Sequence, residues 1–170
     1  IIHARPLGLR SVTFMTNLTE AIKILKEGGI VIYPTDTAFG IGCRIDYEKS
    51  VQKLFRIRRR PQSQATPVLV SSIQMAEKYF LSPIANNVRQ MMEEYWPGAL
   101  TIIYNCRKDI IPLLVRGGGE TVGLRMPKHD IPIALINAGG VPILGPSANF
   151  HGQPTPFEYS QLDRQLIKLV

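Results

Sequence analysis

The chain has 170 residues, 45% of them hydrophobic, which is enough to bury a sizeable core within a single domain. No apolar run is long enough to cross a bilayer, and the first ten residues lack the apolar stretch of a secretion signal, so we expect no membrane association. Two cysteines, Cys43 and Cys106, are too few for a disulfide scaffold, and no Cys/His cluster has zinc spacing. We therefore expect a cytoplasmic protein without a bound metal.

Lysine and arginine outnumber aspartate and glutamate by 20 to 13, which gives a net charge of +7 at pH 7. A basic chain attracts polyanions such as a nucleoside triphosphate or RNA, although the charge can also serve solubility alone. The charge is concentrated at Arg56, Arg58, Arg59 and Arg60. In extended backbone, Arg58 and Arg60 point the same way and can clamp carboxylate and phosphate groups; the alternative is a solvated helix end.

In chain order, residues 12–15 are predicted to form a short strand, and Asn17 and Glu20 a capping box for a helix that the glycines at 28–29 end. The elements that follow are strands 30–33 and 39–45, helix 46–58 capped by Asp46, strand 67–71, helix 72–80 capped by Ser72, helix 82–95 with Ser82 as cap and Pro83 at its first position, strand 99–104, a helical turn at 109–115, strand 121–126, helix 130–138, strand 141–144 and helix 157–169. Because helices and strands alternate imperfectly, a layered mixed sheet is favoured over a simple doubly wound one.

Small polar residues follow the buried strand 30–33. Thr35, Asp36 and Thr37 place two hydroxyls and a carboxylate at the end of this strand, and Gly40 and Gly42 keep the next backbone slim. Open α/β sheets usually bind their ligands just beyond the ends of buried strands. The alternative is a plain strand-to-turn junction.

A second polar pair follows strand 141–144, and an arginine lies within strand 121–126. Ser147 and Asn149 share one side of an extended segment, where they can bond a ligand or form an Asx or Ser turn. Arg125, between Leu124 and Met126, needs an anionic partner, which is either a ligand or an internal carboxylate. Glycines 117–119 form an anion nest, a lid hinge or a plain loop.

The common catalytic motifs are missing from the sequence. The three histidines suggest no triad, Ser147 lacks a G-x-S-x-G elbow, and no Walker A sequence is present. Hydroxyls, amides and arginines remain, a set that suits the binding and electrostatic stabilisation of phosphate and carboxylate groups.

Five segments together resemble the YrdC-type threonylcarbamoyl-AMP synthase family. They are IVIYPTDTAFGIGC, LFRIRRRP with PVLV, WPGALTIIY, TVGLRMP and GPSANFHGQPTP, in the order of that family and over residues 17–157. The resemblance implies an α+β or α/β fold of three layers, in which a twisted mixed β-sheet is flanked by helices and has a concave basic face. It implies one such domain over residues 1–170, without the C-terminal strand segment in which the family usually continues.

The resemblance implies that the chain is an L-threonylcarbamoyladenylate synthase. Such an enzyme makes threonylcarbamoyl-AMP and pyrophosphate from L-threonine, bicarbonate or CO2, and ATP, for the threonylcarbamoyladenosine modification of tRNA. ATP would be a substrate, accompanied by Mg2+, and no tightly bound cofactor is implied. Further partners would be tRNA or double-stranded RNA and other tRNA-modification proteins.

The resemblance also assigns roles to individual residues. They are Arg58 and Arg60 as catalytic residues, Thr37, Arg125 and Ser147 for threonine, and Arg60, Thr121 and Asn149 for ATP. Arg58 stands where the family usually has lysine, so the charge is kept but the compact ammonium is not. Two other functions are compatible with the sequence: an RNA-binding module without catalysis, and a carbamoyl-transfer domain of the same fold.

Overall fold

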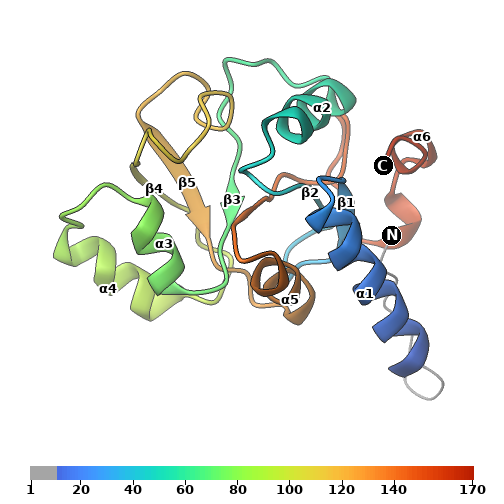
Figure 1. The fold of residues 1–170 in the computed structure, drawn as a ribbon, viewed down its shortest axis with the longest axis horizontal. Coiled ribbons are helices and arrows are strands. Elements are labelled where there is room, and N and C mark those ends of the chain that lie inside the picture. The colour runs from blue at the N-terminus through green and yellow to red at the C-terminus, as the bar shows by residue number, and fades with distance from the viewer. Residues whose placement is uncertain (1–10) are drawn as a thin grey trace.

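The computed structural model describes residues 11–170, with side chains from residue 18 onward (Figure 1). Its helices and strands are α1 (Ser11–Lys26), β1 (Val31–Tyr33), β2 (Gly40–Gly42), α2 (Glu48–Arg58), β3 (Val68–Leu69), α3 (Ile73–Tyr79), α4 (Asn86–Tyr95), β4 (Ile102–Asn105), β5 (Thr121–Arg125), α5 (Asp130–Gly139), β6 (Ile143–Leu144), the 3-10 helix η1 (Tyr159–Gln161) and α6 (Arg164–Ile167). Within this described part, no helix is both long enough and apolar enough to traverse a membrane.

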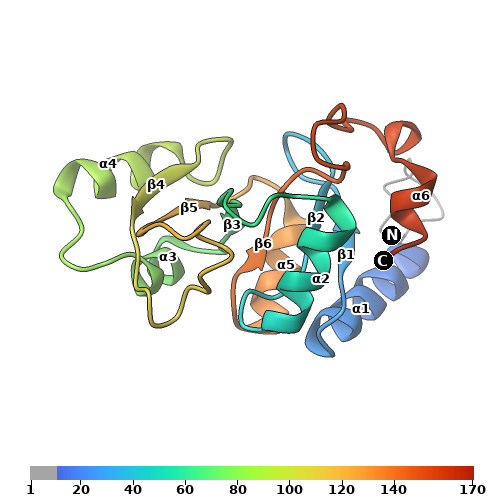
Figure 2. The ribbon, with the colours of Figure 1, turned by 90° about the horizontal axis from the view of Figure 1, so that it is seen from above.

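The strands form a four-stranded sheet and a two-stranded hairpin. The sheet has the order β4-β5-β3-β6, with β3 parallel to β5 and the other neighbours antiparallel. The hairpin pairs β1 with β2, and two isolated bridges connect this region to the region of β6: Gly40 pairs with Ser147, which follows β6, and Arg44, which follows β2, pairs with Ile143. Helices α3 and α4 lie beside β4 and β5, whereas α1, α2 and α5 surround the other half (Figure 2). The mixed sheet flanked by helices that the sequence predicts is therefore confirmed.

The core consists of two clusters of buried apolar side chains. The larger one lies among the sheet, α2, α3 and α4, and the smaller one joins α1 and α5 to β1. Tyr33 connects the hairpin to the sheet, because its buried hydroxyl donates to the Leu144 carbonyl at 2.7 Å. Gly42 passes so close that a Cβ there would lie 2.1 Å from the same carbonyl oxygen, which is why only glycine fits.

Three predictions for the first 50 residues are wrong. The strand predicted at residues 12–15 is part of helix α1, which begins at Ser11, so Asn17 is inside the helix and does not cap it. A capping-box signature is local, whereas the helix is stabilised by tertiary packing of its apolar face, on which Ala21 and Leu25 are buried against α5. Asp46 does not cap α2 either; it pairs with Arg44, and Tyr47 is the N-cap.

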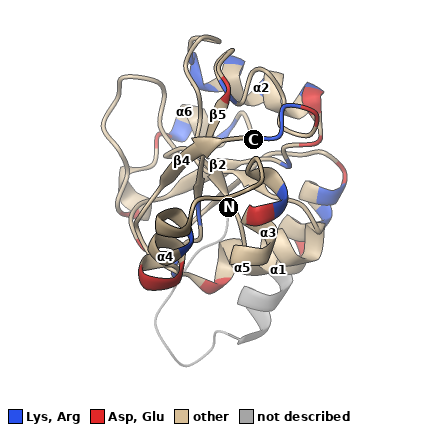
Figure 3. Ribbon diagram, turned by 90° about the vertical axis from the view of Figure 1, so that its left-hand side faces the viewer, with Lys and Arg blue, Asp and Glu red and all other residues tan. Residues whose placement is uncertain are grey.

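The start of α4 and the last helix also differ from the prediction. Helix α4 begins at Asn86 rather than after Ser82, because the Leu81 and Ala85 amides donate to β4, to the Asn105 carbonyl and the Tyr104 hydroxyl. The predicted helix 157–169 is two short pieces, η1 and α6, since Asp163 begins a new cap between them. Ser72 caps α3 as predicted, by accepting from the Met75 amide at 3.0 Å. Charges are distributed over several elements in Figure 3, and the concave basic face stays a prediction.

Candidate functional site

Polar segments that follow β1 and β6, together with the end of β5, line one cavity of about 260 Å³. The segment after β1 supplies its hydroxyls, β5 its arginine, β6 the Gly-Pro-Ser turn, and residues 155–157 its rim. The lining residues are Thr35, Thr37, Ala38, Phe39, Gly40, Leu69, Arg125, Gly145, Pro146, Ser147, Thr155 and Phe157. The cavity is thus lined by all three residues to which the family resemblance assigns threonine binding: Thr37, Arg125 and Ser147.

Backbone pairing brings these segments together although they are distant in the sequence. The Ile41 amide donates to the Pro146 carbonyl at 3.0 Å, and the Ala148 amide donates to Phe39 at 2.8 Å. Gly145 lies so close to Leu69 that a Cβ there would be 2.4 Å from the leucine Cγ. The glycine therefore lets the turn after β6 pack directly over β3.

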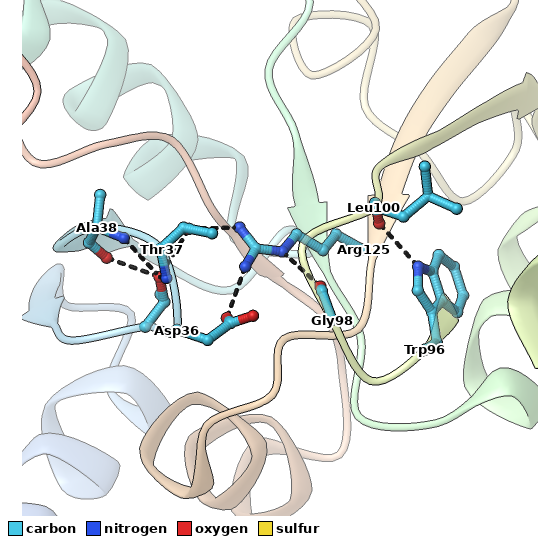
Figure 4. A network of polar contacts seen from close by, with 8 residues as sticks. Asp36, Thr37, Ala38, Trp96, Gly98, Leu100 and Arg125 are labelled. Atoms are coloured by element: carbon cyan, nitrogen blue, oxygen red, sulfur yellow. Dashed lines mark hydrogen bonds and ion pairs between the residues drawn. The ribbon is translucent and has the colours of Figure 1, made fainter. Parts of the chain in front are cut away.

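Arg125 is held from three sides at the end of β5 (Figure 4). Its Nε donates to the Gly98 carbonyl at 2.9 Å, Nη1 to the Thr37 hydroxyl at 2.8 Å, and Nη2 to the Asp36 carboxylate at 2.6 Å. The structure thus identifies Asp36 as the internal anionic partner that the strand arginine requires. A guanidinium has five N–H groups, so one on each terminal nitrogen is left for a ligand.

The hydroxyls of Thr35 and Thr37 have different hydrogen-bonding roles in the turn after β1. The Thr35 hydroxyl donates to the Ala38 carbonyl at 2.7 Å and accepts from the amides of Thr37 and Ala38 at 3.1 Å. Because the Thr35 proton is committed, the Thr37 hydroxyl can donate to Thr35, 3.2 Å away, or to a ligand. Thr37 therefore offers the cavity a hydroxyl whose oxygen is already oriented by Arg125.

Arg58 is buried behind the segment that follows β6. Its Nε donates to the Asn149 carbonyl at 3.1 Å and its Nη2 to the Asn149 side-chain oxygen at 3.2 Å, while Nη1 is buried without a partner. Burial, together with the nearby charge of Arg60, lowers the pKa of Arg58 to about 10. The hydrogen-bond partners of Arg58 are therefore neutral, and its charge is held in the interior without an acidic partner among them.

Asn149 connects Arg58 to the cavity. Its side-chain oxygen accepts from the Ser147 hydroxyl at 2.6 Å, and its amide nitrogen donates to the Gln153 carbonyl at 2.5 Å. The oxygen and the nitrogen of the Asn149 side chain therefore both have protein partners, which fixes the orientation of the amide. Because the Ser147 proton points to Asn149, the Ser147 oxygen is left to accept a hydrogen bond from a ligand in the cavity.

Arg60 and Thr121 do not line this cavity. Arg60 donates to the Gln64 carbonyl at 3.3 Å and to the Ala65 carbonyl, and burial lowers its pKa. Thr121 is exposed at the opposite end of β5 from Arg125, on the same face of the strand but about 13 Å away. A ligand that touches both must extend along β5.

The anion-nest interpretation of glycines 117–119 is wrong. Their three amides donate to the carbonyls of Leu114, Leu113 and Arg116, so none is free for an anion. Sequence reasoning also missed the carbonyls of Gly98 and Gln153, because a backbone acceptor leaves no signal in residue type. Within the described residues, no group of three or more His, Cys, Asp or Glu side chains could hold a metal ion.

Comparison with known proteins gives consistent matches. The profile of the Sua5/YciO/YrdC family, described as "Telomere recombination", matches residues 23–170. The threonylcarbamoyl-AMP synthase of Bacillus subtilis is 35% identical over 139 residues, which cover 82% of this chain and 40% of that protein. The protein of that name from Psychromonas ingrahamii is 31% identical, over 88% of this chain and 78% of its own length.

One of the similar solved structures contains a bound ligand. P. abyssi Sua5 complexed with L-threonine has a TM-score of 0.79 and 28% sequence identity, over 87% of this chain and 45% of that one. This chain therefore spans less than half the length of that Sua5 chain and of the B. subtilis relative.

Proposed function

The chain belongs to the Sua5/YciO/YrdC family, and on this premise we propose that it is the catalytic domain of an L-threonylcarbamoyladenylate synthase. The reaction joins L-threonine, CO2 or bicarbonate, and ATP into threonylcarbamoyl-AMP and releases pyrophosphate. Relatives that carry this name, and a similar structure complexed with L-threonine, support the proposal. The observation that carries it is the single cavity in which Thr37, Arg125 and Ser147 meet.

Threonine fits the donors and acceptors of the cavity. Its carboxylate accepts from the two remaining N–H groups of Arg125, and its hydroxyl lies near Thr37. Its amine donates to the Ser147 oxygen, whose own proton is committed to Asn149. A cavity of about 260 Å³ accommodates an amino acid and leaves ATP to bind outside it, toward Arg58, Arg60 and Thr121.

The chemistry then follows from positioning. The threonine ammonium gives one proton to solvent, and the resulting neutral amine attacks CO2. The new N–C bond forms as the second proton also passes to solvent, which gives a carbamate. A carbamate oxygen attacks the α-phosphorus of MgATP, the bond to the β-phosphate oxygen breaks, and pyrophosphate leaves. Arg58 and Arg60 stabilise the negative charge that builds up on the phosphates, with Arg58 acting through its charge, which no acidic hydrogen-bond partner offsets.

The test is pyrophosphate release by the purified chain with ATP, bicarbonate and L-threonine, each omitted in turn. We expect release to need all three, with threonylcarbamoyl-AMP as the product. ATP turnover that ignores threonine would refute the assignment. Turnover of carbamoyl phosphate would point instead to a carbamoyl-transfer domain, and salt-sensitive RNA binding without turnover to an RNA-binding module.

The proposal extends to partners and location. The product serves tRNA modification, so tRNA or double-stranded RNA and other tRNA-modification proteins are the proposed partners, in the cytoplasm. The net charge of +7 is consistent with an RNA partner. We also propose that residues 1–170 act as one domain.

A further inference from the structure

We propose that Asp36 is the positioning residue of the amino-acid site: it acts through Arg125, by fixing which guanidinium N–H groups face the cavity. Asp36 is not among the residues that line the cavity, whereas Arg125 is. Its side chain is 18% exposed and that of Arg125 13%, so the ion pair between them is largely shielded from water. Asp36 thus lies behind the arginine rather than against a ligand.

The geometry shows what Asp36 contributes. Without it, Arg125 would keep the Gly98 carbonyl on Nε and the Thr37 hydroxyl on Nη1, and Nη2 would lose its partner. Two neutral contacts leave the side chain free to tilt, whereas the third, charged contact fixes the plane of the guanidinium. A ligand carboxylate needs both free N–H groups in one orientation, so its binding depends on this third contact.

Asp36 also sets the charge of the site. The carboxylate offsets the charge of Arg125, so the pair presents directed donors with little net charge. This arrangement suits a zwitterion, which brings its own positive group, and the inference rests on the proposed function only for naming that ligand as threonine. The charge of Asp36 also acts on His129, the N-cap of α5, where it favours the charged imidazolium.

The experiment compares Asp36→Ala and Asp36→Asn with a matched control, Asp46→Ala. The control removes an aspartate–arginine pair of the same kind, with Arg44, whose Nη2–Oδ2 distance is 2.7 Å and which is not part of the cavity. For Asp36→Ala we expect the KM for threonine to rise by about 10- to 100-fold, with the KM for ATP changed less than about twofold. Asp46→Ala should change neither constant. Equal changes in both constants, or an unchanged KM for threonine, would overturn the proposal.

Asp36→Asn separates hydrogen-bond geometry from charge. Its amide oxygen can still accept from Nη2, so a positioning role predicts a KM for threonine between those of the wild type and Asp36→Ala. If Asp36→Asn is as impaired as Asp36→Ala, charge rather than orientation is what Asp36 supplies, and the positioning role is refuted.

A ligand-free measurement separates this inference from the proposed function. The Nη–H signals of Arg125 in a proton–nitrogen correlation spectrum, assigned by their loss in Arg125→Lys, should be sharp in the wild type and in Asp46→Ala. In Asp36→Ala they should broaden or exchange with water, because Nη2 loses its partner there. Signals that stay sharp in Asp36→Ala contradict the inference, even if the wild type makes threonylcarbamoyl-AMP. Conversely, a wild type that releases no pyrophosphate with threonine removes the proposed function but leaves this result valid.

Discussion

Arg125 lines the cavity and Arg58 is connected to it through Asn149 and Ser147, yet the protein surrounds the two arginines in opposite ways. Arg125 has an aspartate, a hydroxyl and a carbonyl as partners, so its charge is offset and its orientation fixed. Arg58 is only 4% exposed, bonds two neutral oxygens of Asn149 and keeps a buried N–H unpaired. The surroundings of Arg125 fix the orientation of its N–H groups and offset its charge. Those of Arg58 leave its positive charge without an acidic hydrogen-bond partner.

Under the proposed function, the two environments serve different tasks: that of Arg125 serves recognition of the amino acid, and that of Arg58 serves stabilisation of charge. An amino acid is recognised by the geometry of its carboxylate and amine, for which a fixed, neutralised arginine is suited. A triphosphate that is losing pyrophosphate needs uncompensated positive charge in a place that water does not reach. The four substitutions below test this division, from the largest expected effect to the smallest.

Replacing Arg58 with methionine should have the largest effect. We expect the rate of pyrophosphate release to fall by about 100- to 1,000-fold, because the buried charge and both bonds to Asn149 are lost. The free energy of unfolding should change by no more than about 1 kcal/mol, since a buried cation without an acidic partner contributes little to stability. Steady-state kinetics and urea unfolding measure the two quantities. A variant that is unfolded, or fully active, would contradict the description of Arg58.

Replacing Arg125 with lysine should raise the KM for threonine by about 10- to 100-fold and leave the KM for ATP nearly unchanged. A lysine ammonium cannot serve Gly98, Thr37 and Asp36 while also presenting two parallel donors to a carboxylate. Initial rates at varied threonine and at varied ATP give both constants. If the KM for ATP rises as much as that for threonine, Arg125 is not specific to the amino acid, and the proposed separation of roles between Arg125 and Arg58 is wrong.

Replacing Asn149 with aspartate would make the surroundings of Arg58 resemble those of Arg125. The new carboxylate should pair with the buried guanidinium, raise its pKa from about 10 and compete with phosphates, so that the KM for ATP rises by about 10-fold. Asn86→Asp, which adds the same charge at an exposed residue of α4, is the control and should leave the KM unchanged. An unchanged KM for ATP in Asn149→Asp would show that Arg58 needs no uncompensated charge.

The smallest effect concerns pH on the Arg125 side of the site. His129 caps α5 by accepting from the Ile131 amide at 3.2 Å, and burial lowers its pKa below the ordinary 6.5. The unfolded chain therefore binds this proton more readily, so the contribution to stability is complete above pH 6.5 and is lost as the pH falls through the lower, folded value. Between pH 7 and pH 5, the melting temperature should fall by ~2 °C more in the wild type than in His129→Asn, which keeps the cap. If the melting temperatures of the wild type and His129→Asn fall equally between pH 7 and pH 5, titration of His129 does not contribute to the pH dependence of stability.

The sequence predicts the Arg125 half of the site better than the Arg58 half. Polar residues after buried strands mark the former, because β1 and β6 are short apolar runs whose ends are recognisable in the sequence, and Arg125 is marked by its position between two apolar residues near the end of β5. For Arg58, the sequence leaves open a solvated helix end, and its burial depends on a distant segment: the His151 amide donates to the Arg58 carbonyl at 2.7 Å and Asn149 covers the guanidinium. No local pattern encodes that packing.

Helix ends show the same limit. The cap at Ser72 is predicted because it involves only neighbouring residues, whereas the start of α4 is shifted by hydrogen bonds to β4, about 20 positions away. The pairing of Asp36 with Arg125 is also unpredicted, although both residues are singled out as candidates, because 89 positions separate them.

The hydrogen bonds of the Arg125 side chain join three stretches of chain, at residues 36–37, 98 and 125. These stretches meet only when the hairpin has packed against the sheet. A partly folded molecule that lacks either half cannot form the cavity that we propose for an amino acid. A bound amino acid would therefore stabilise only the completed native state, and its uptake would report tertiary assembly rather than secondary structure.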